Sequence, residues 1–188
     1  MAPHPDNMTL WTIGHSTRAI EDFLGLLVAH DIRHLVDVRT IPRSRNNPQY
    51  NTDALVKSLA KARLVYSHRP DLGGLRKAKK ESVNTGWRNL SFRGYADYMQ
   101  TDGFWIALDG LIADGQHRRT AIMCAEAVPW RCHRSMIADA LVSRGWTVLD
   151  IMTEQRAAAH RLTPFAHVVN GRLTYPPPFD DALPSLYA

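Results

Sequence analysis

The chain contains little cysteine and no long apolar run. Cys124 and Cys132 are the only cysteines among 188 residues, too few for the disulfide framework of a small secreted domain. The apolar run that begins at Met8 is too short and too soon interrupted to be a signal peptide or a membrane helix. We therefore expect a cytoplasmic protein with no membrane partner, in which both cysteines are thiols, either structural or reactive.

The short motifs that mark metal sites are also missing. The sequence has neither a Cys-x-x-Cys pair nor a His-Glu-x-x-His pattern, which supply the closely spaced ligands of most zinc sites. Cys132 and His133 are conceivable ligands together with Cys124 and His15, but no standard spacing supports them. The sequence therefore predicts no metal and no other cofactor.

Strands and helices are predicted to alternate along the chain. Helical patterns at residues 92–100 and 104–114 belong to this alternation, and Gly115 is expected to stop the second. Asn170-Gly171 predicts a hairpin near the end. The expected strands lie at residues 8–13, 34–39, 64–66, 120–124 and 147–152.

This alternation predicts one Rossmann-like, three-layer α/β domain over residues 8–175. Its parallel sheet would have five strands in the order 3-2-1-4-5, followed by the C-terminal hairpin. We expect a disordered N-terminus at residues 1–7 and an irregular tail at 176–188, where three prolines follow one another.

Unusual polar residues follow three of the predicted strands. Gly14-His15-Ser16-Thr17 ends the first, Asp37 and Arg39 end the second, and the stretch from Cys124 to Arg134 follows the fourth. Ligands of open α/β sheets bind at the carboxyl ends of strands where the winding reverses. The sequence therefore predicts a functional site there, with a ligand set of Ser16, Asp37, Arg39, Arg43, Gly73, Gly74, His133 and Arg134.

The candidate catalytic residues each have a structural alternative. Cys124 and Cys132 are either nucleophiles or small buried side chains, and Glu126 is either an acid/base group or a partner for Arg134. His15 is a base, a phosphate contact or a strand-end histidine that holds a carbonyl. Asp37 and Arg39 form either a ligand clamp or a buried ion pair.

One spacing argues against a familiar site. A cysteine at a strand end followed by an arginine resembles the anion cradle of rhodaneses and cysteine phosphatases, where five residues separate the two. Here six residues separate Cys124 from Arg131, and Pro129-Trp130 would stiffen the loop. Arg134 lies in the first turn of a predicted helix, where a cation is disfavoured unless an anion is near. The arginines therefore indicate an anionic ligand more firmly than the cysteines indicate a nucleophile.

Positive charge is concentrated in the segment from Arg69 to Arg93. The whole chain has 23 basic and 18 acidic residues, an excess of five, and this segment alone has seven basic residues against Asp71 and Glu81. Such a segment is either a surface that binds nucleic acid or a solvated loop. The candidate nucleic-acid contacts are Arg76, Lys77, Lys79, Lys80 and Trp87.

These motifs, taken in order, resemble the family catalogued as domain of unknown function (DUF) 488. The resemblance spans about residues 12–152, and it implies the α/β fold and the location of the site but no reaction. One departure is Asp150-Ile151, where the family pattern tends to have His-Ile. The matching pieces are Thr12-Ile-Gly-His-Ser16, Asp37-Val-Arg39, Pro42-Arg43-Ser44, Asn51 with Leu55, Tyr66, Leu72-Gly73-Gly74, Tyr95-Ala96, Cys124-Ala-Glu126 and Cys132-His133-Arg134.

Two hypotheses of function remain open from the sequence. In the first, the protein is an enzyme that binds a phosphate-bearing ligand, a nucleotide or a nucleic-acid end, at the rim of the sheet. In the second, it is a non-catalytic nucleic-acid-binding or adaptor module that uses the basic segment 69–93. The sequence defines no reaction, substrate or oligomeric state.

Overall fold

A six-stranded, mostly parallel sheet forms the centre of the molecule. The computed structural model describes residues 8–177. The sheet has the order β3-β2-β4-β1-β5-β6, in which β6 alone is antiparallel to its neighbour. Its strands are β1 (Thr9–Gly14), β2 (His34–Asp37), β3 (Val65–His68), β4 (Thr120–Cys124), β5 (Thr147–Ile151) and β6 (Ala157–Ala159).

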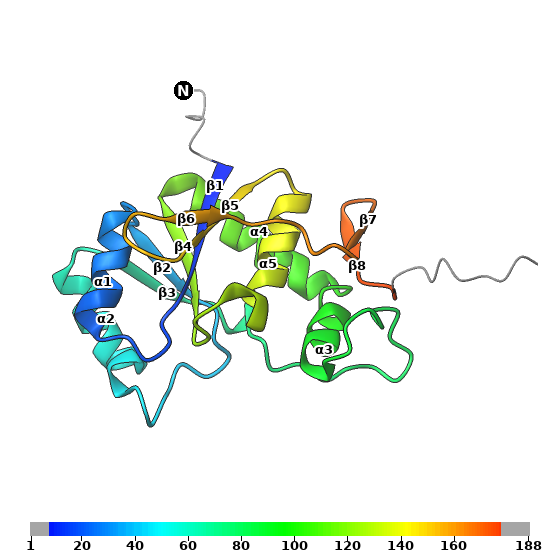
Figure 1. The fold of residues 1–188 in the computed structure, drawn as a ribbon, viewed down its shortest axis with the longest axis horizontal. Helices are drawn as coiled ribbons and strands as arrows, with labels where there is room; N and C mark the ends of the chain where they lie inside the picture. Colours follow the sequence, from blue (N-terminus) through cyan, green and yellow to red (C-terminus); the bar gives the residue numbers. More distant parts are fainter. Residues whose placement is uncertain (1–7, 178–188) are drawn as a thin grey trace, which may run out of the picture.

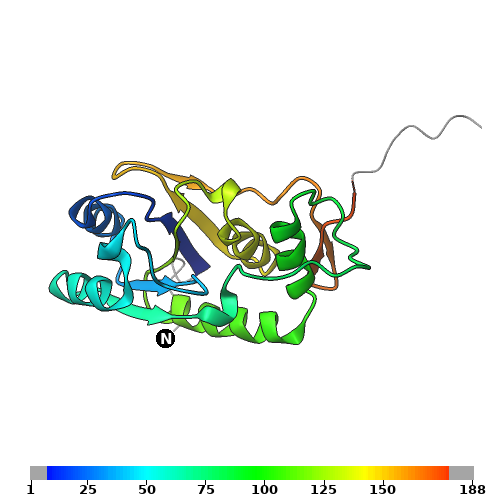
Figure 2. The same cartoon turned by 90° about the horizontal axis from the view of Figure 1, so that it is seen from below.

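Five α-helices and three short 3-10 turns connect these strands. Helices α1 and α2 lie on one side of the sheet and α4 and α5 on the other (Figures 1 and 2), and the α/β fold class predicted from the sequence is confirmed. The helices are α1 (Ile20–Ala29), α2 (Thr52–Lys61), α3 (Leu90–Tyr98), α4 (Asp102–His117) and α5 (Arg134–Ser143), and the 3-10 turns are η2 (Pro48–Tyr50), η3 (Pro70–Leu72) and η4 (Pro129–Arg131).

Alternating strand residues divide the core into two clusters, one for each face. Leu35 and Met123 pack with Phe23 of α1 and Leu55 of α2 in one cluster. Their neighbours Val36 and Ile122 pack with α3, α4 and α5 in the other. Successive strand residues point to opposite faces, so continuous apolar strands such as β4, whose five residues are all buried, are expected between two helix layers.

The predicted strand order is wrong at the centre of the sheet. Strand β4 lies between β2 and β1, whereas the prediction placed β1 next to β2. Both β1 and β4 are interior strands in either order, so their apolar pattern does not distinguish the two. The exchange brings the end of β2 beside that of β4, and the Val38 N–H donates to the Met123 carbonyl at 3.0 Å.

The glycine expected to stop a helix, Gly115, lies inside α4, and so does Gly103, which precedes the predicted helical pattern at 104–114. Gly103 is in the first turn of α4, and Gly115 lies two residues before its end at His117. A Cβ on Gly115 would lie 3.1 Å from both Leu10 and Trp146. Gly115 therefore permits close packing of α4 and does not end it, which explains the error.

A small antiparallel hairpin follows the main sheet. Strands β7 (His167–Val169) and β8 (Arg172–Thr174) pair with each other, and both turn residues, Asn170 (φ 51°) and Gly171 (φ 73°), have the positive φ that such a turn requires. Among residues 8–177 we find no helix with the length and apolarity needed to span a membrane. The disorder predicted for residues 1–7, and the irregular tail from residue 178 onward, lie outside the described residues.

Candidate active site

A cavity of about 380 Å³ opens at the carboxyl ends of β2 and β4. Its wall is made of three segments that are distant in the sequence and that the fold brings together. The cavity is lined by Arg39, Thr40 and Ile41 after β2, by Gly74, Leu75, Ser91 and Phe92 from the basic segment and the start of α3, and by Cys124, Ala125, Glu126, Arg131, Cys132 and His133 after β4.

Both cysteines face one histidine in this cavity. The His133 Nδ1 lies 3.9 Å from the Cys124 sulfur and 3.7 Å from the Cys132 sulfur. The other ring nitrogen, Nε2, lies 3.2 Å from the Val38 carbonyl oxygen, which only accepts hydrogen bonds. The Nε2 atom therefore carries the proton, and the lone pair of Nδ1 points at the two sulfurs.

Glycine permits the close approach of the basic segment to this ring. A Cβ on Gly74 would lie 2.5 Å from the His133 Nδ1, well inside van der Waals contact. Tyr95 flanks the ring with its centroid 5.0 Å away. The Leu72-Gly73-Gly74 sequence thus allows the backbone to cover the imidazole, while Gly73 itself packs against Thr40.

The two sulfurs have opposite electrostatic situations. A hydrogen bond between them, together with burial, raises the pKa of the Cys124 thiol well above its usual value. The same hydrogen bond is the main cause that lowers the pKa of Cys132, and the charge of Arg134 acts in the same direction, whereas burial opposes both. Of the two thiols, Cys132 is therefore the one that ionises more readily.

Two charged side chains of the cavity have no partner. Glu126 and Arg131 are exposed, and neither side chain makes a hydrogen bond or an ion pair within residues 8–177. Glu126 is thus not the ion-pair partner of Arg134, which was the structural alternative for it. An unpaired carboxylate and an unpaired guanidinium remain available to a ligand.

Arg134 supports the loop from beneath and does not line the cavity. Its side chain is 1% exposed and donates to the main-chain oxygens of Glu126 at 2.5 Å and Ala127 at 3.0 Å. A Cβ on Gly14 would lie only 1.8 Å from the same Glu126 oxygen. Arg134 and Gly14 therefore determine the path of the loop that presents Glu126.

His15 and Asp37 hold Arg39 in place. The Arg39 guanidinium binds Asp37 through Nε at 2.9 Å and Nη2 at 2.6 Å, and its Nη1 lies 3.3 Å from the His15 Nε2. The His15 ring donates to the Ser16 carbonyl at 2.8 Å and stacks on Tyr50. Burial lowers the pKa of His15 to about 4, so the ring is neutral and acts as a hydrogen-bonded support.

Two other predicted ligand residues lie outside the cavity wall. Ser16 has a positive φ of 50°, and its N–H donates to the Ala125 carbonyl at 2.8 Å, which ties the end of β1 to the loop after β4. Arg43 is exposed and does not line the cavity. Sequence proximity to the site therefore does not place either side chain in it.

The basic segment is folded around one buried carboxylate. Asp97 of α3 accepts from the Lys79 N–H at 2.8 Å, the Ser82 hydroxyl at 2.5 Å and the Asn84 amide at 2.8 Å. Trp87 stacks on Phe92 with the ring centroids 4.8 Å apart. The segment is therefore an ordered structure and not a solvated loop.

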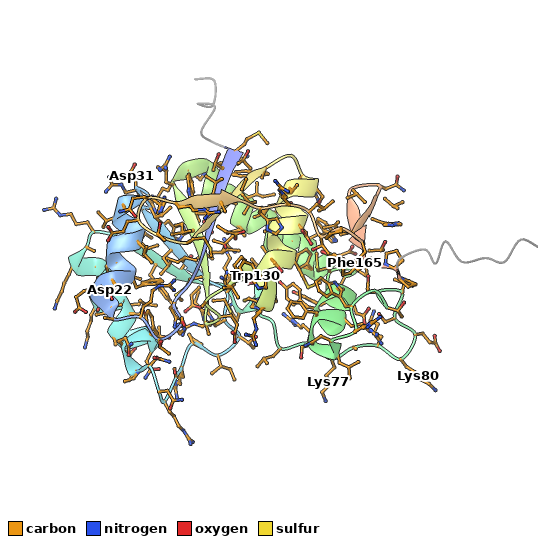
Figure 3. The ribbon with its side chains drawn as sticks, viewed as in Figure 1. Asp22, Asp31, Lys77, Lys80, Trp130 and Phe165 are labelled. Carbon is orange, nitrogen blue, oxygen red and sulfur yellow. The ribbon has the colours of Figure 1, made fainter. Side chains whose placement is uncertain are left out.

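Only some of its basic side chains are free. Arg76 donates to the Gly73 and Asp71 carbonyls and lies over the Tyr98 ring. The side chains of Lys77, Lys79 and Lys80 have no partner within residues 8–177 and are exposed, and Figure 3 shows Lys77 and Lys80 extending outward. Of the predicted nucleic-acid contacts, these three lysines are thus the accessible ones.

Seven residues of the cavity wall and one buried network were not predicted from the sequence. Ala125 and Arg131 lie in the stretch from Cys124 to Arg134, and Phe92 lies among the basic residues of the segment 69–93, whereas Thr40, Ile41, Leu75 and Ser91 carried no signal. The network has Asp139 at its centre and includes Asp150, the position at which the chain departs from the family pattern. It consists of Thr12, Asp139, Asp150, His160, Thr163 and Tyr175.

Comparison with known proteins agrees with the motifs. The family model described as "Domain of unknown function DUF488" matches residues 19–141, well over half of the 188 residues. No curated protein and no solved structure matches the chain. The matched region includes the ends of β2 and β4 and the complete wall of the cavity, so the chain belongs to the DUF488 family.

Proposed function

We propose that the protein is an enzyme that binds a phosphate-bearing ligand, a nucleotide or a nucleic-acid end, in the cavity at the ends of β2 and β4. One observation carries the proposal. An unpaired carboxylate, Glu126, and an unpaired guanidinium, Arg131, share a cavity with the thiol–imidazole cluster of Cys124, Cys132 and His133. Groups that the fold does not use are available for chemistry.

Size and polarity support a small anionic ligand. A volume of about 380 Å³ lies within the range of roughly 300–1,000 Å³ of small-molecule sites. Arg131 supplies a cation that makes no hydrogen bond or ion pair within residues 8–177, and α5 begins beside the cavity with no acidic residue in its first turn to repel an anion. Leu75 and Phe92 offer apolar surface for a base or a sugar.

The cavity residues divide into two roles. Glu126 is assigned to proton transfer, because its carboxylate is free and exposed at the cavity. The cluster of Cys124, Cys132 and His133 is assigned to the reacting atom of the ligand. Arg134, His15 and Asp37 are positioning residues, since their polar atoms are bound to the protein itself.

The test is a thermal-shift panel of nucleotides, oligonucleotide ends and sugar phosphates, followed by turnover assays on each binder. We expect at least one ligand to raise Tm and Arg131→Ala to remove that shift, while Arg43→Ala, an exposed arginine outside the cavity, leaves it intact. Glu126→Gln should retain the shift and lose turnover. A panel with no binder, or a shift that survives Arg131→Ala, would reject the proposal.

A second candidate function rests on the three exposed lysines. Lys77, Lys79 and Lys80 form a basic edge that suits a non-catalytic nucleic-acid-binding or adaptor module. This module would bind oligonucleotides with a steep salt dependence that Glu126→Gln and Cys124→Ser do not change. Replacing the three lysines by glutamine should then reduce both the affinity and the salt slope. Loss of oligonucleotide binding in Arg131→Ala instead would favour the enzyme.

A further inference from the structure

We propose that Cys124, Cys132 and His133 form a binding site for a zinc-type divalent metal ion, with one coordination position open to the cavity. The ion would be the means by which this cluster acts on the ligand, and to that extent the inference rests on the proposed function. Metal binding itself is argued from the geometry of the three side chains alone.

The spacing of the donor atoms fits a tetrahedral ion. Metal bonds of roughly 2.3 Å to sulfur and 2.0–2.1 Å to nitrogen place tetrahedral ligand atoms about 3.5–3.8 Å apart. The Sγ–Nδ1 distances are 3.9 Å for Cys124 and 3.7 Å for Cys132, and the three donor atoms all lie within 4.8 Å of one another. The two Sγ–Nδ1 distances therefore need to shorten by only a few tenths of an ångström for the imidazole and the sulfurs to bind one ion.

The histidine is already oriented as a ligand. Its Nε2–H donates to the Val38 carbonyl at 3.2 Å, so Nδ1 presents its lone pair to the sulfurs. A hydrogen bond from the second ring nitrogen to a carbonyl or carboxylate accompanies nearly every ligating histidine. Gly74 and Tyr95 pack against the ring, which further reduces its freedom to turn away.

The donor set selects the kind of ion. Two thiolates and an imidazole suit zinc and its soft neighbours, whereas magnesium and calcium prefer oxygen. Three protein ligands with a fourth position open are typical of catalytic zinc, while structural zinc has four. Glu126 and Arg131 line the same cavity as the three ligands, so a bound ion with its fourth position open to the cavity would polarise an oxygen of the ligand.

The fold assembles these ligands from an unusual sequence spacing. Seven residues separate Cys124 from Cys132, which is why no short motif announces the site. The loop turns back through η4, where the Cys132 N–H donates to the Pro129 carbonyl at 2.9 Å, and Arg134 holds its first part. The loop shape therefore returns Cys132 and His133 to the end of β4.

The test is a titration of the full chain, stripped of metal, with Co²⁺ followed by competition with Zn²⁺. We expect a single ion per chain, a near-ultraviolet sulfur-to-cobalt charge-transfer band, and the strong visible bands of tetrahedral cobalt. Cys124→Ser, Cys132→Ser and His133→Ala should each weaken binding by more than about 100-fold. The matched control is His117→Ala, an exposed histidine far from the cluster in sequence, and it should bind as the parent does.

Circular dichroism and urea unfolding of each variant show whether it is folded. If His133→Ala does not fold, the two serine variants still test the proposal. Absence of the sulfur band, or cobalt affinity unchanged in both serine variants, overturns the proposal. The ligand panel in metal-free protein separates the two proposals. A Tm shift that depends on Arg131 but needs no metal leaves the proposed function standing, whereas metal binding without any ligand shift rejects that function alone.

Discussion

Two polar regions of the molecule border cavities, yet they use their side chains in opposite ways. Within residues 8–177, the cavity at the ends of β2 and β4 leaves the side chains of Glu126 and Arg131 without hydrogen-bond or ion-pair partners. The network around Asp139 borders a larger cavity of about 730 Å³ through Asp150 and His160. There the Asp139 carboxylate accepts from the His160 ring at 2.9 Å, the Thr163 N–H at 3.0 Å and the Tyr175 hydroxyl at 2.9 Å.

The remaining groups of the network are paired as well. Asp150 accepts from the Thr12 hydroxyl at 2.5 Å and lies 3.5 Å from the second ring nitrogen of His160. Both regions thus contain a carboxylate and a histidine. Cavity size alone would favour the region of the network as the functional site. The pairing of polar atoms distinguishes them, because a group already bound to the protein must give up a partner before it can bind a ligand. We therefore assign the network to stability and the smaller cavity to function.

The largest expected effect comes from breaking the network at its centre. Asp139 is fully buried, and Asp139→Ala removes the acceptor of three donors and leaves the His160 charge with one carboxylate. We expect a loss of about 3–5 kcal/mol in the free energy of unfolding, measured by urea denaturation. Glu126→Ala is the matched control, since the same carboxylate-to-alanine change should cost little there. Equal losses of unfolding free energy in Asp139→Ala and Glu126→Ala would contradict the difference between the paired network and the unpaired cavity side chains.

Protonation of His160 should make stability depend on pH. Although burial opposes the charge, the hydrogen bonds and charges of Asp139 and Asp150 raise the pKa of His160 to about 9 from 6.5. A group whose pKa is raised on folding adds stability below its unfolded pKa and loses it as pH rises through the folded value. We expect up to about 3 kcal/mol to be lost between pH 6.5 and 9.

The measurement is the urea midpoint over this pH range. His160→Gln should flatten the curve, whereas His117→Gln, on the exposed surface, should follow the parent. A curve of unchanged slope in His160→Gln would show that the network does not hold a charged histidine. The network around Asp139 would then not be stabilised by ion pairs with His160, as the comparison of the two regions assumes.

A third prediction concerns the arginine that links the two regions. Arg134 donates to the Glu126 and Ala127 carbonyls and reaches the Thr12 hydroxyl at 3.4 Å. Arg134→Ala leaves these acceptors unsatisfied and should cost about 2 kcal/mol in urea unfolding, together with weaker ligand binding because the Glu126 loop loses its support. Arg131→Ala, three positions earlier, should weaken ligand binding without that loss of stability. Equal losses of stability and of ligand binding in the two variants would contradict the assignment of Arg134 to support of the loop and of Arg131 to the ligand.

The sequence predicted the layers of this fold better than the details of its site. Apolar runs and their spacing depend on burial, so the five parallel strands and the alternating helices could be recognised. The order of β1 and β4 could not, because both strands are interior in either arrangement. Gly115 was misjudged for a related reason, since tight packing and helix termination both favour glycine.

Within the site, residue type identified the candidates but not their partners. The Asp37–Arg39 ion pair was one of two alternatives in the sequence, whereas the main-chain oxygens of the loop after β4 that bind Arg134 could not be foreseen. Asp97 was unremarkable in the sequence and holds the basic segment together. Hydrogen-bond pairing across 18 to more than 100 residues depends on tertiary structure, which local patterns do not contain.

The smallest effect on stability is expected where function is assigned. Glu126→Gln and Arg131→Ala remove charges that make no contact within residues 8–177, so each should change the free energy of unfolding by no more than about 0.5 kcal/mol. Their position in a cavity, and not their exposure alone, is the reason for assigning these two side chains to a ligand. Thermal unfolding with and without the best phosphate-bearing binder checks this directly. The two variants should unfold as the parent does without ligand and differ from it only when the ligand is present. A loss of about 2 kcal/mol or more in the absence of ligand would mean that these side chains stabilise the loop. The distinction between the two regions would then be wrong.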